Sequence, residues 1–211
     1  MTFTVFKEKL MQKSFKKSLC LVLCLAITLG LSACSGGASM SEENITATVE
    51  TIEKALKNFD GITLQKYVKS DTLKTILTLS NSHSQFSDLG RAMFEKLEIQ
   101  VKSIDRKNKT VTLLVTNRDM SQIAGTFAKQ VLEGKSVFQL AGLLNNEQFL
   151  DTSLAKLTAE ISEATVPDNP KEITVSIEKS KKNLILVFDE KAEDAVSGGV
   201  LTAIMNSITV S

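Results

Sequence analysis

Cys34 has the most chemically informative sequence context in the chain. It follows Leu31-Ser32-Ala33, at the end of an apolar segment of 13 residues, 19–31, and five lysines lie ahead of that segment. A membrane-spanning helix needs about 20 apolar residues, whereas a signal-peptide core takes roughly 7–15. The pattern therefore predicts an export leader ahead of Cys34, over residues 1–33. Met11 is an alternative start for this leader.

The tetrapeptide ending at Cys34 resembles a bacterial lipobox at every position. The resemblance implies cleavage before Cys34 and a diacylglyceryl (palmitate-type) group on its sulfur. Two acyl chains hold a protein on a membrane far more firmly than one. We therefore expect a lipoprotein anchored at the outer face of the cell membrane, with residues 34–43 as lipidated cysteine and flexible tether. The alternative is an ordinary secretory signal cut after Ala33, which leaves a soluble protein.

Charge and cysteine content restrict the mature part. The leader holds five lysines and one glutamate, which leaves 20 basic and 23 acidic residues and a net charge of −3. A general nucleic-acid partner needs a basic face, so we expect none. Cys20 and Cys24 leave with the leader, so no disulfide can form within the mature chain.

Other residues with chemical potential are isolated. His83 is the single histidine and lies in a polar stretch without a second ligand, so we predict no metal site and no Ser-His-Asp site. Tyr67 is the single tyrosine and is expected in the core or at its rim. The basic stretch 179–182 is expected to be a solvated turn, although a membrane beside it would offer anionic lipid.

The carboxylates have structural explanations. Asp60 precedes a glycine at a helix end, while Asp71, Asp119 and Asp189 stand where helices are expected to begin. Most glutamates fall on polar helix faces. We therefore assign no catalytic residue and no cofactor.

Hydrophobic spacing predicts the elements that must position any site. Apolar steps of three and four indicate helices beginning at residues 41, 62, 71, 86, 119, 147 and 189, and an apolar, helical connector over 136–144. The helix from Asp119 should carry a capping box with Gln122, and the last should contain Gly198-Gly199 for close approach to a sheet. A polar loop is expected over 80–84.

Alternating apolar residues indicate two antiparallel hairpins, 99–115 and 173–188. Helices, hairpin, helices, hairpin and helix give an α+β fold, with helices on a curved antiparallel sheet of about four strands. Residues 44–211 are expected to form this single domain.

The phrase Val115-Thr116-Asn117-Arg118-Asp119-Met120, together with the helical start and the sheet, resembles small lipoproteins of Gram-positive bacteria. Their domain is a cystatin-like cone, the fold typified by nuclear transport factor two, so the resemblance implies a cone. The helices expected between residues 136 and 163 depart from the minimal form of that fold and leave the strand order open.

Two function classes remain. The first is a non-catalytic, membrane-anchored binding or interaction module for a small ligand or an envelope partner, with contacts from the strands and from the helix near Asn44. The second is an enzyme doing isomerase- or dehydratase-like acid–base chemistry in an apolar pocket. A titratable group lining the main concave site would favour the enzyme. We expect the binding module.

Overall fold

The computed structural model describes residues 38–132, 135, 139, 142–143 and 145–209. The predicted leader, Cys34 and most of the connector 136–144 lie outside the described residues. Within them the chain is α+β, as predicted, with helices and a mixed open sheet. Residues 38–211 form one compact unit.

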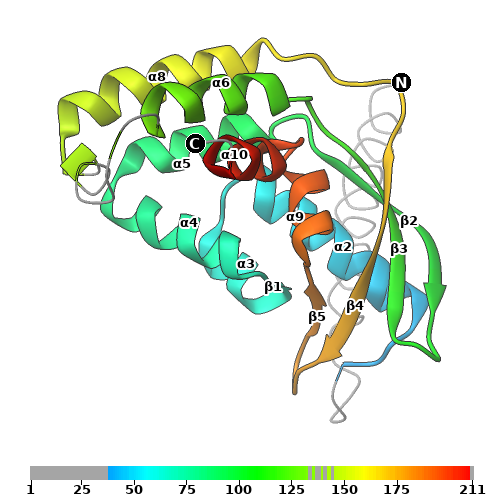
Figure 1. Ribbon diagram of the computed structural model, residues 1–211. Coiled ribbons are helices and arrows are strands. Elements are labelled where there is room, and N and C mark those ends of the chain that lie inside the picture. Colours follow the sequence, from blue (N-terminus) through cyan, green and yellow to red (C-terminus); the bar gives the residue numbers. More distant parts are fainter. Residues whose placement is uncertain (1–37, 133–134, 136–138, 140–141, 144, 210–211) are drawn as a thin grey trace, which may run out of the picture. The chain divides into compact units, whose positions relative to one another are not determined.

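The described elements follow the expected order, and we keep the labels of Figure 1. The helices are α2 (Glu42–Lys57), α3 (Gly61–Tyr67), α4 (Asp71–Ser82), α5 (Ser84–Phe94), α6 (Ser121–Leu132), α8 (Glu147–Ser162), α9 (Glu190–Val196) and α10 (Val200–Thr209). The strands are β1 (Val68–Lys69), β2 (Glu98–Asp105), β3 (Thr110–Thr116), β4 (Lys171–Lys179) and β5 (Leu184–Val187).

Both predicted hairpins are confirmed, because β2 pairs with β3 and β4 with β5, each antiparallel. The sheet order is β1-β5-β4-β3-β2, so it has five strands rather than about four. The additional strand, β1, runs parallel to β5 over two residues, where the sequence predicts the end of a helix. Two residues are too few to produce a periodic pattern, so only pairing with β5 reveals this strand.

Helix α2 follows the predicted amphipathic pattern. Ser41 caps it by accepting a hydrogen bond from the Asn44 backbone N–H, and the predicted apolar stripe is buried. The helix ends where Phe59 takes a positive φ of 52°. Asp60, expected to end this helix, instead caps α3 through the N–H groups of Ile62 and Thr63.

The prediction of a polar loop over 80–84 is wrong, because α4 continues to Ser82 and α5 begins at Ser84. The hydroxyls of Thr75, Thr78 and Ser80 donate to backbone carbonyls one turn earlier, so these polar side chains are satisfied inside the helix. Only His83 interrupts the two helices.

The prediction of a single helix after Asp189 is also wrong, because two helices, α9 and α10, follow this residue. Asp189 does cap a helix, α9, but the chain breaks at Gly198 and Gly199, whose φ angles are 64° and 88°. L-residues rarely adopt these angles, and the two glycines end α9 and redirect the chain into α10. The close approach is to the segment after β3, not to the sheet.

The core is one apolar cluster between helices and sheet. Helix α2 contacts both β2 and β5, so it crosses the sheet. Alternate residues of β3 and β4 are buried, as a half-buried sheet requires. In Figure 1, α4, α5, α6, α8 and α10 gather on the left, away from the long strands on the right. The possible sites lie among these helices and along the outer strand β2.

Candidate functional site

Two adjoining apolar cavities, of about 110 and 230 Å³, lie among the gathered helices. They share lining residues from α4, α5 and α10. These shared residues are Leu73, Ile76, Met93, Phe94, Val200 and Ile204. The larger cavity is completed by apolar side chains of α6 and α8. We refer to the pair as the helical cavity.

In the part of the chain that the structure describes, no polar side chain lines the larger part of the helical cavity. Phe127 of α6 and Leu154, Leu157 and Ile161 of α8 line it, and Phe59 closes it from the end of α2. Phe59 stacks on Phe94 with 6.4 Å between ring centroids. A Cβ on Gly90 would lie 2.3 Å from the Phe59 ring, so only glycine at position 90 leaves room for this contact. The wall is therefore apolar and closely packed on this side.

The smaller part of the helical cavity has a polar end. Ser70, Thr72, Glu193 and Ser197 line it beside the apolar side chains. Ser70 caps α4 by accepting from the Leu73 N–H (2.9 Å), and its hydroxyl donates a short hydrogen bond to a Glu193 carboxylate oxygen. Among the described residues, Glu193 is the one ionisable side chain that lines either part.

A second concave region runs between α2 and the outer strand β2, with a volume of about 880 Å³. It is an open groove with mixed walls. Glu42, Glu50, Lys102, Asp105 and Arg106 line it beside apolar residues of both elements. This groove is the place where the sequence predicted ligand contacts, on strands and on the helix near Asn44. Its walls are open and combine charged with apolar side chains.

The groove is fixed at the start of β2. Glu53 accepts from the Ile99 backbone N–H (2.9 Å) and pairs with Lys57 (2.7 Å). Helix α2 and β2 are thereby held together where α2 ends. The groove lies along the remainder of the two elements.

A third groove, of about 630 Å³, lies between α6 and α10. Asp119 and Asp194 line it together with Lys171. The Ser121 hydroxyl and N–H both donate to Asp119, and they lower the pKa of its carboxyl. The capping box predicted with Gln122 is replaced by these bonds, since the Asp119 N–H donates instead to the Thr165 carbonyl (2.8 Å).

Asn117 and Arg118, which belong to the segment 115–120 that carries the resemblance described above, have a structural role. Asn117 is buried, and its Nδ2 donates to the Met93 carbonyl (3.0 Å) and the Val196 carbonyl (2.8 Å). Arg118 is also buried, and its guanidinium donates to the Ala92 carbonyl (3.1 Å) and to Glu95 (2.9 Å). Asn117 and Arg118 thus join the ends of α5 and α9 to β3.

In the described chain the pKa is shifted clearly for four carboxyls and one lysine. Hydrogen bonds lower the pKa of three of these carboxyls. Thr63 donates to Asp60, Arg118 to Glu95, and Asn108 to Asp105. The side-chain hydrogen bond to Glu178 raises the pKa of Lys69. Each shift favours the charged form, whereas a general acid at neutral pH needs a carboxyl whose pKa is raised.

The other residues considered from the sequence lie apart. His83 is half-buried between α4 and α5, with its ring 6.2 Å from that of Phe86. Tyr67 packs partly buried against the core, as expected. Among the described residues no group of three His, Cys, Asp or Glu side chains is placed to hold a metal ion.

The helical cavity was missed from the sequence. Leu73, Ile76, Phe86, Leu89 and Phe127 read as ordinary core positions, yet all are only partly buried. The one indication of this cavity in the sequence was that several helices carry an apolar face. The sequence does not show that these faces converge.

Two further findings complete the description. No described helix has the length and apolar character to span a membrane. Neither a family model, nor a curated protein, nor a solved structure matches this chain.

Proposed function

We propose that this protein is a lipoprotein held on the outer face of the cell membrane by acylated Cys34. In this proposal its domain binds a small, largely apolar molecule in the helical cavity and releases it unchanged. The observation that carries the binding proposal is the wall of the cavity, which in the described chain is built mainly from apolar side chains of seven helices, α2, α4, α5, α6, α8, α9 and α10. Ligand sites are typically apolar with a few placed polar groups.

The size of the cavity sets the class of ligand. Its larger part holds about 230 Å³. A dry cavity of roughly 150 Å³ accepts benzene. The helical cavity therefore suits a molecule somewhat larger than benzene, such as a short acyl chain or a small bicyclic compound.

The polar end suggests how such a molecule would be oriented. Ser70 and Glu193 are hydrogen-bonded to each other beside Thr72 and Ser197. One hydroxyl or amine on the ligand would join this pair, while the apolar part extends toward α6 and α8. A carboxylate would be disfavoured next to the Glu193 carboxylate.

The alternative, isomerase- or dehydratase-like acid–base chemistry, would use Glu193, the ionisable side chain that lines the cavity among the residues described. Glu193 has a hydrogen-bond donor in Ser70, which is a capping residue of α4. A titratable group at the cavity is the feature that would favour an enzyme, but the hydrogen bond to the capping residue gives this carboxylate a structural role. Binding is therefore preferred over turnover.

The cone-like form of the fold belongs to the same proposal. The crossing of the sheet by α2 supports it, as does the irregular register of β2 between Val101 and Ser103, since a bulge bends a strand. Helices α6 and α8, inserted between β3 and β4, depart from the minimal cone.

The anchor is tested by Cys34→Ala. Wild-type protein should carry an acyl modification detectable by mass spectrometry and should sediment with membranes, whereas the variant should appear in the soluble fraction. Serine at position 35 provides a matched control, because Ser35→Ala should leave membrane attachment unchanged. An unmodified wild-type protein would contradict the anchor.

Binding is tested on protein that starts at residue 34 and carries Cys34→Ala. Medium-chain alcohols, the corresponding fatty acids and naphthol are titrated while thermal stability and calorimetric heat are followed. We expect saturable binding, stronger for alcohols than for acids. Ala124→Leu, which places a larger side chain in the cavity wall, should weaken binding at least tenfold.

Ala47→Leu is the control, since Ala47 is exposed on α2. Equal binding by the Ala124→Leu and Ala47→Leu proteins would place the ligand elsewhere. A reaction product that forms with wild-type protein and disappears with Glu193→Gln would establish the enzymatic alternative instead.

A further inference from the structure

Both hairpin turns lie at the same end of the sheet. In the register, Thr110 at the start of β3 pairs with Ser176 near the end of β4, and Asp105 at the end of β2 pairs with Thr110. The turns 106–109 and 180–183 therefore follow the ends of β2 and β4, the two strands that flank β3 and run antiparallel to it. Figure 1 shows both turns at the lower edge of the molecule.

These two turns are basic. Their five cationic side chains and that of Lys179, the last residue of β4, are all exposed, and none of the six has an ion-pair partner among the described residues. The six are Arg106, Lys107, Lys109, Lys179, Lys181 and Lys182. We call them the turn cations.

Acidic groups near the turns balance only part of this charge. Asp105 accepts hydrogen bonds from Asn108, and Glu178 pairs with Lys69 (2.8 Å). Glu42 and Glu43 lie in the first turn of α2. The turn cations therefore outnumber the unpaired carboxylates beside them.

The described chain begins at this end as well. Ala38 and Met40 pack against the core, and Glu42 at the start of α2 lines the same groove as Asp105 and Arg106. Figure 1 shows the blue start of the described chain at the lower edge, between the two turns. Cys34 precedes Ala38 by four positions. At about 3.3–3.6 Å per residue, four residues reach at most about 14 Å.

We infer that the turn cations form the surface that lies on the anionic headgroups of the membrane holding the protein. This inference rests on the proposed acylation of Cys34, which would keep the start of the domain within a short reach of the lipid. Each Lys or Arg near an anionic surface strengthens attachment by about fivefold, and the effect falls off within a Debye length, about 8 Å at physiological salt.

This placement has a consequence for the helical cavity. Helix α6 follows the opposite end of β3 and α8 precedes the opposite end of β4, where Val115 pairs with Lys171. The turn cations would thus face the lipid while α6 and α8 stay on the side away from it. The anchored domain would have a fixed orientation rather than tumble on its tether.

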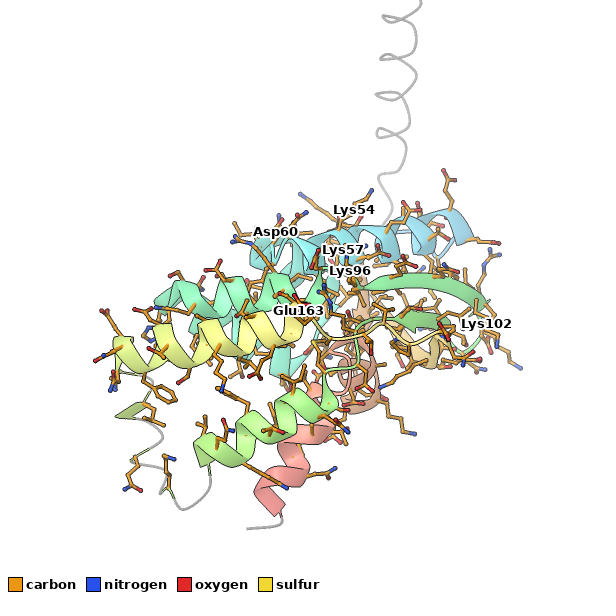
Figure 2. All side chains as sticks on the ribbon, turned by 90° about the horizontal axis from the view of Figure 1, so that it is seen from above. Lys54, Lys57, Asp60, Lys96, Lys102 and Glu163 are labelled. Carbon is orange, nitrogen blue, oxygen red and sulfur yellow. The ribbon has the colours of Figure 1, made fainter. Side chains whose placement is uncertain are left out.

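Lysines on other surfaces provide internal controls. Lys54, Lys74 and Lys129 are exposed and unpaired among the described residues, and they lie on α2, α4 and α6. Figure 2 shows Lys54 and Lys57 near Lys96, around the last turns of α2, and Lys102 apart from them on β2. This part of α2 lies at the opposite end of the helix from the chain start beside the turns.

The test is lysine footprinting of the acylated full-length product in vesicles. An amine-reactive reagent labels protein in vesicles of phosphatidylcholine alone or with about one-third phosphatidylglycerol, and mass spectrometry gives the rate at each lysine. We expect labelling of Lys107, Lys109, Lys179, Lys181 and Lys182 to slow at least threefold with phosphatidylglycerol. Labelling of Lys54, Lys74 and Lys129 should stay unchanged.

High salt sharpens the test. At about 1 M salt the Debye length is roughly 3 Å, so the protection should disappear if it is electrostatic. Replacing Lys179, Lys181 and Lys182 by Gln should remove the protection of Lys107 and Lys109. The control variant, with Lys54, Lys74 and Lys129 replaced by Gln, has the same net charge as the first variant. In it Lys107 and Lys109 should remain protected.

The outcomes separate this inference from the anchor. Phosphatidylcholine has no net charge, so flotation with these vesicles reports the acylated cysteine alone. A protein that floats with them but shows no selective protection with phosphatidylglycerol would overturn the surface proposal and leave the anchor standing. A protein that does not float refutes the anchor, and with it the membrane-held orientation inferred here.

Discussion

Gly198 lies directly against the backbone of Arg118. A Cβ on Gly198 would be 2.1 Å from the Arg118 carbonyl oxygen, and the Gly198 carbonyl accepts from the Met120 N–H at 2.9 Å. The break between α9 and α10 is therefore fitted to the segment after β3. Two features of this contact require glycine: the positive φ and the short distance to the Arg118 carbonyl oxygen.

Gly198→Ala should lower the free energy of unfolding by about 2–4 kcal/mol, because it combines an unfavourable φ with a backbone clash. Urea denaturation measures the change. Gly142→Ala is the control, since a Cβ there meets nothing within 4 Å. Equal stability of the two variants would show that the contact is not formed.

Asn117→Asp keeps the shape of the side chain but replaces the amide by a carboxylate facing two carbonyl oxygens. The expected loss at pH 7 is about 3 kcal/mol or more, since a buried donor is lost and like partial charges meet. Acidification should recover part of the loss, because a protonated carboxyl can donate one hydrogen bond. Asn108→Asp, at an exposed turn, should cost less than about 1 kcal/mol. A loss at position 117 that does not depend on pH would contradict this explanation.

The contribution of Glu95 to the free energy of unfolding should decrease in acid. Its hydrogen bond and ion pair with Arg118 lower its pKa below the ordinary 4.5. A carboxyl with a lowered folded-state pKa contributes stability above its unfolded pKa and loses it as pH falls through the folded value. The stability difference between wild type and Glu95→Gln should therefore be largest near pH 7 and shrink below about pH 4.5. Chemical denaturation at several pH values measures it, and a difference that grows in acid would contradict the pairing.

Val175 and Ser176 are neighbours on β4 that face opposite sides, one buried at 2% exposure and the other exposed. Val175→Asp should prevent stable folding, because an unpaired charge would enter the core, at a cost of more than about 4 kcal/mol. Ser176→Asp should change the thermal midpoint by only a few degrees. Comparable unfolding of both variants would show that the register of β4 differs from the one described.

The sequence by itself determined the local elements of this protein. The stripe of α2, the cap at Ser41 and the alternation in β3 and β4 follow from side-chain periodicity within a few residues. Both hairpins and the α+β class could be read for the same reason. The lipobox around Cys34 is likewise a local pattern, and its consequence remains a prediction.

Tertiary structure decided the features that depend on residues distant in the chain. Gly198 breaks a helix because the backbone at Arg118 occupies the adjacent space, and Asn117 is buried because the ends of α5 and α9 supply carbonyls for it. Periodicity says which face of a helix is apolar, but not which helices converge. The helical cavity exists because α4, α5, α6, α8 and α10 leave space between apolar faces that each look like ordinary core in the sequence.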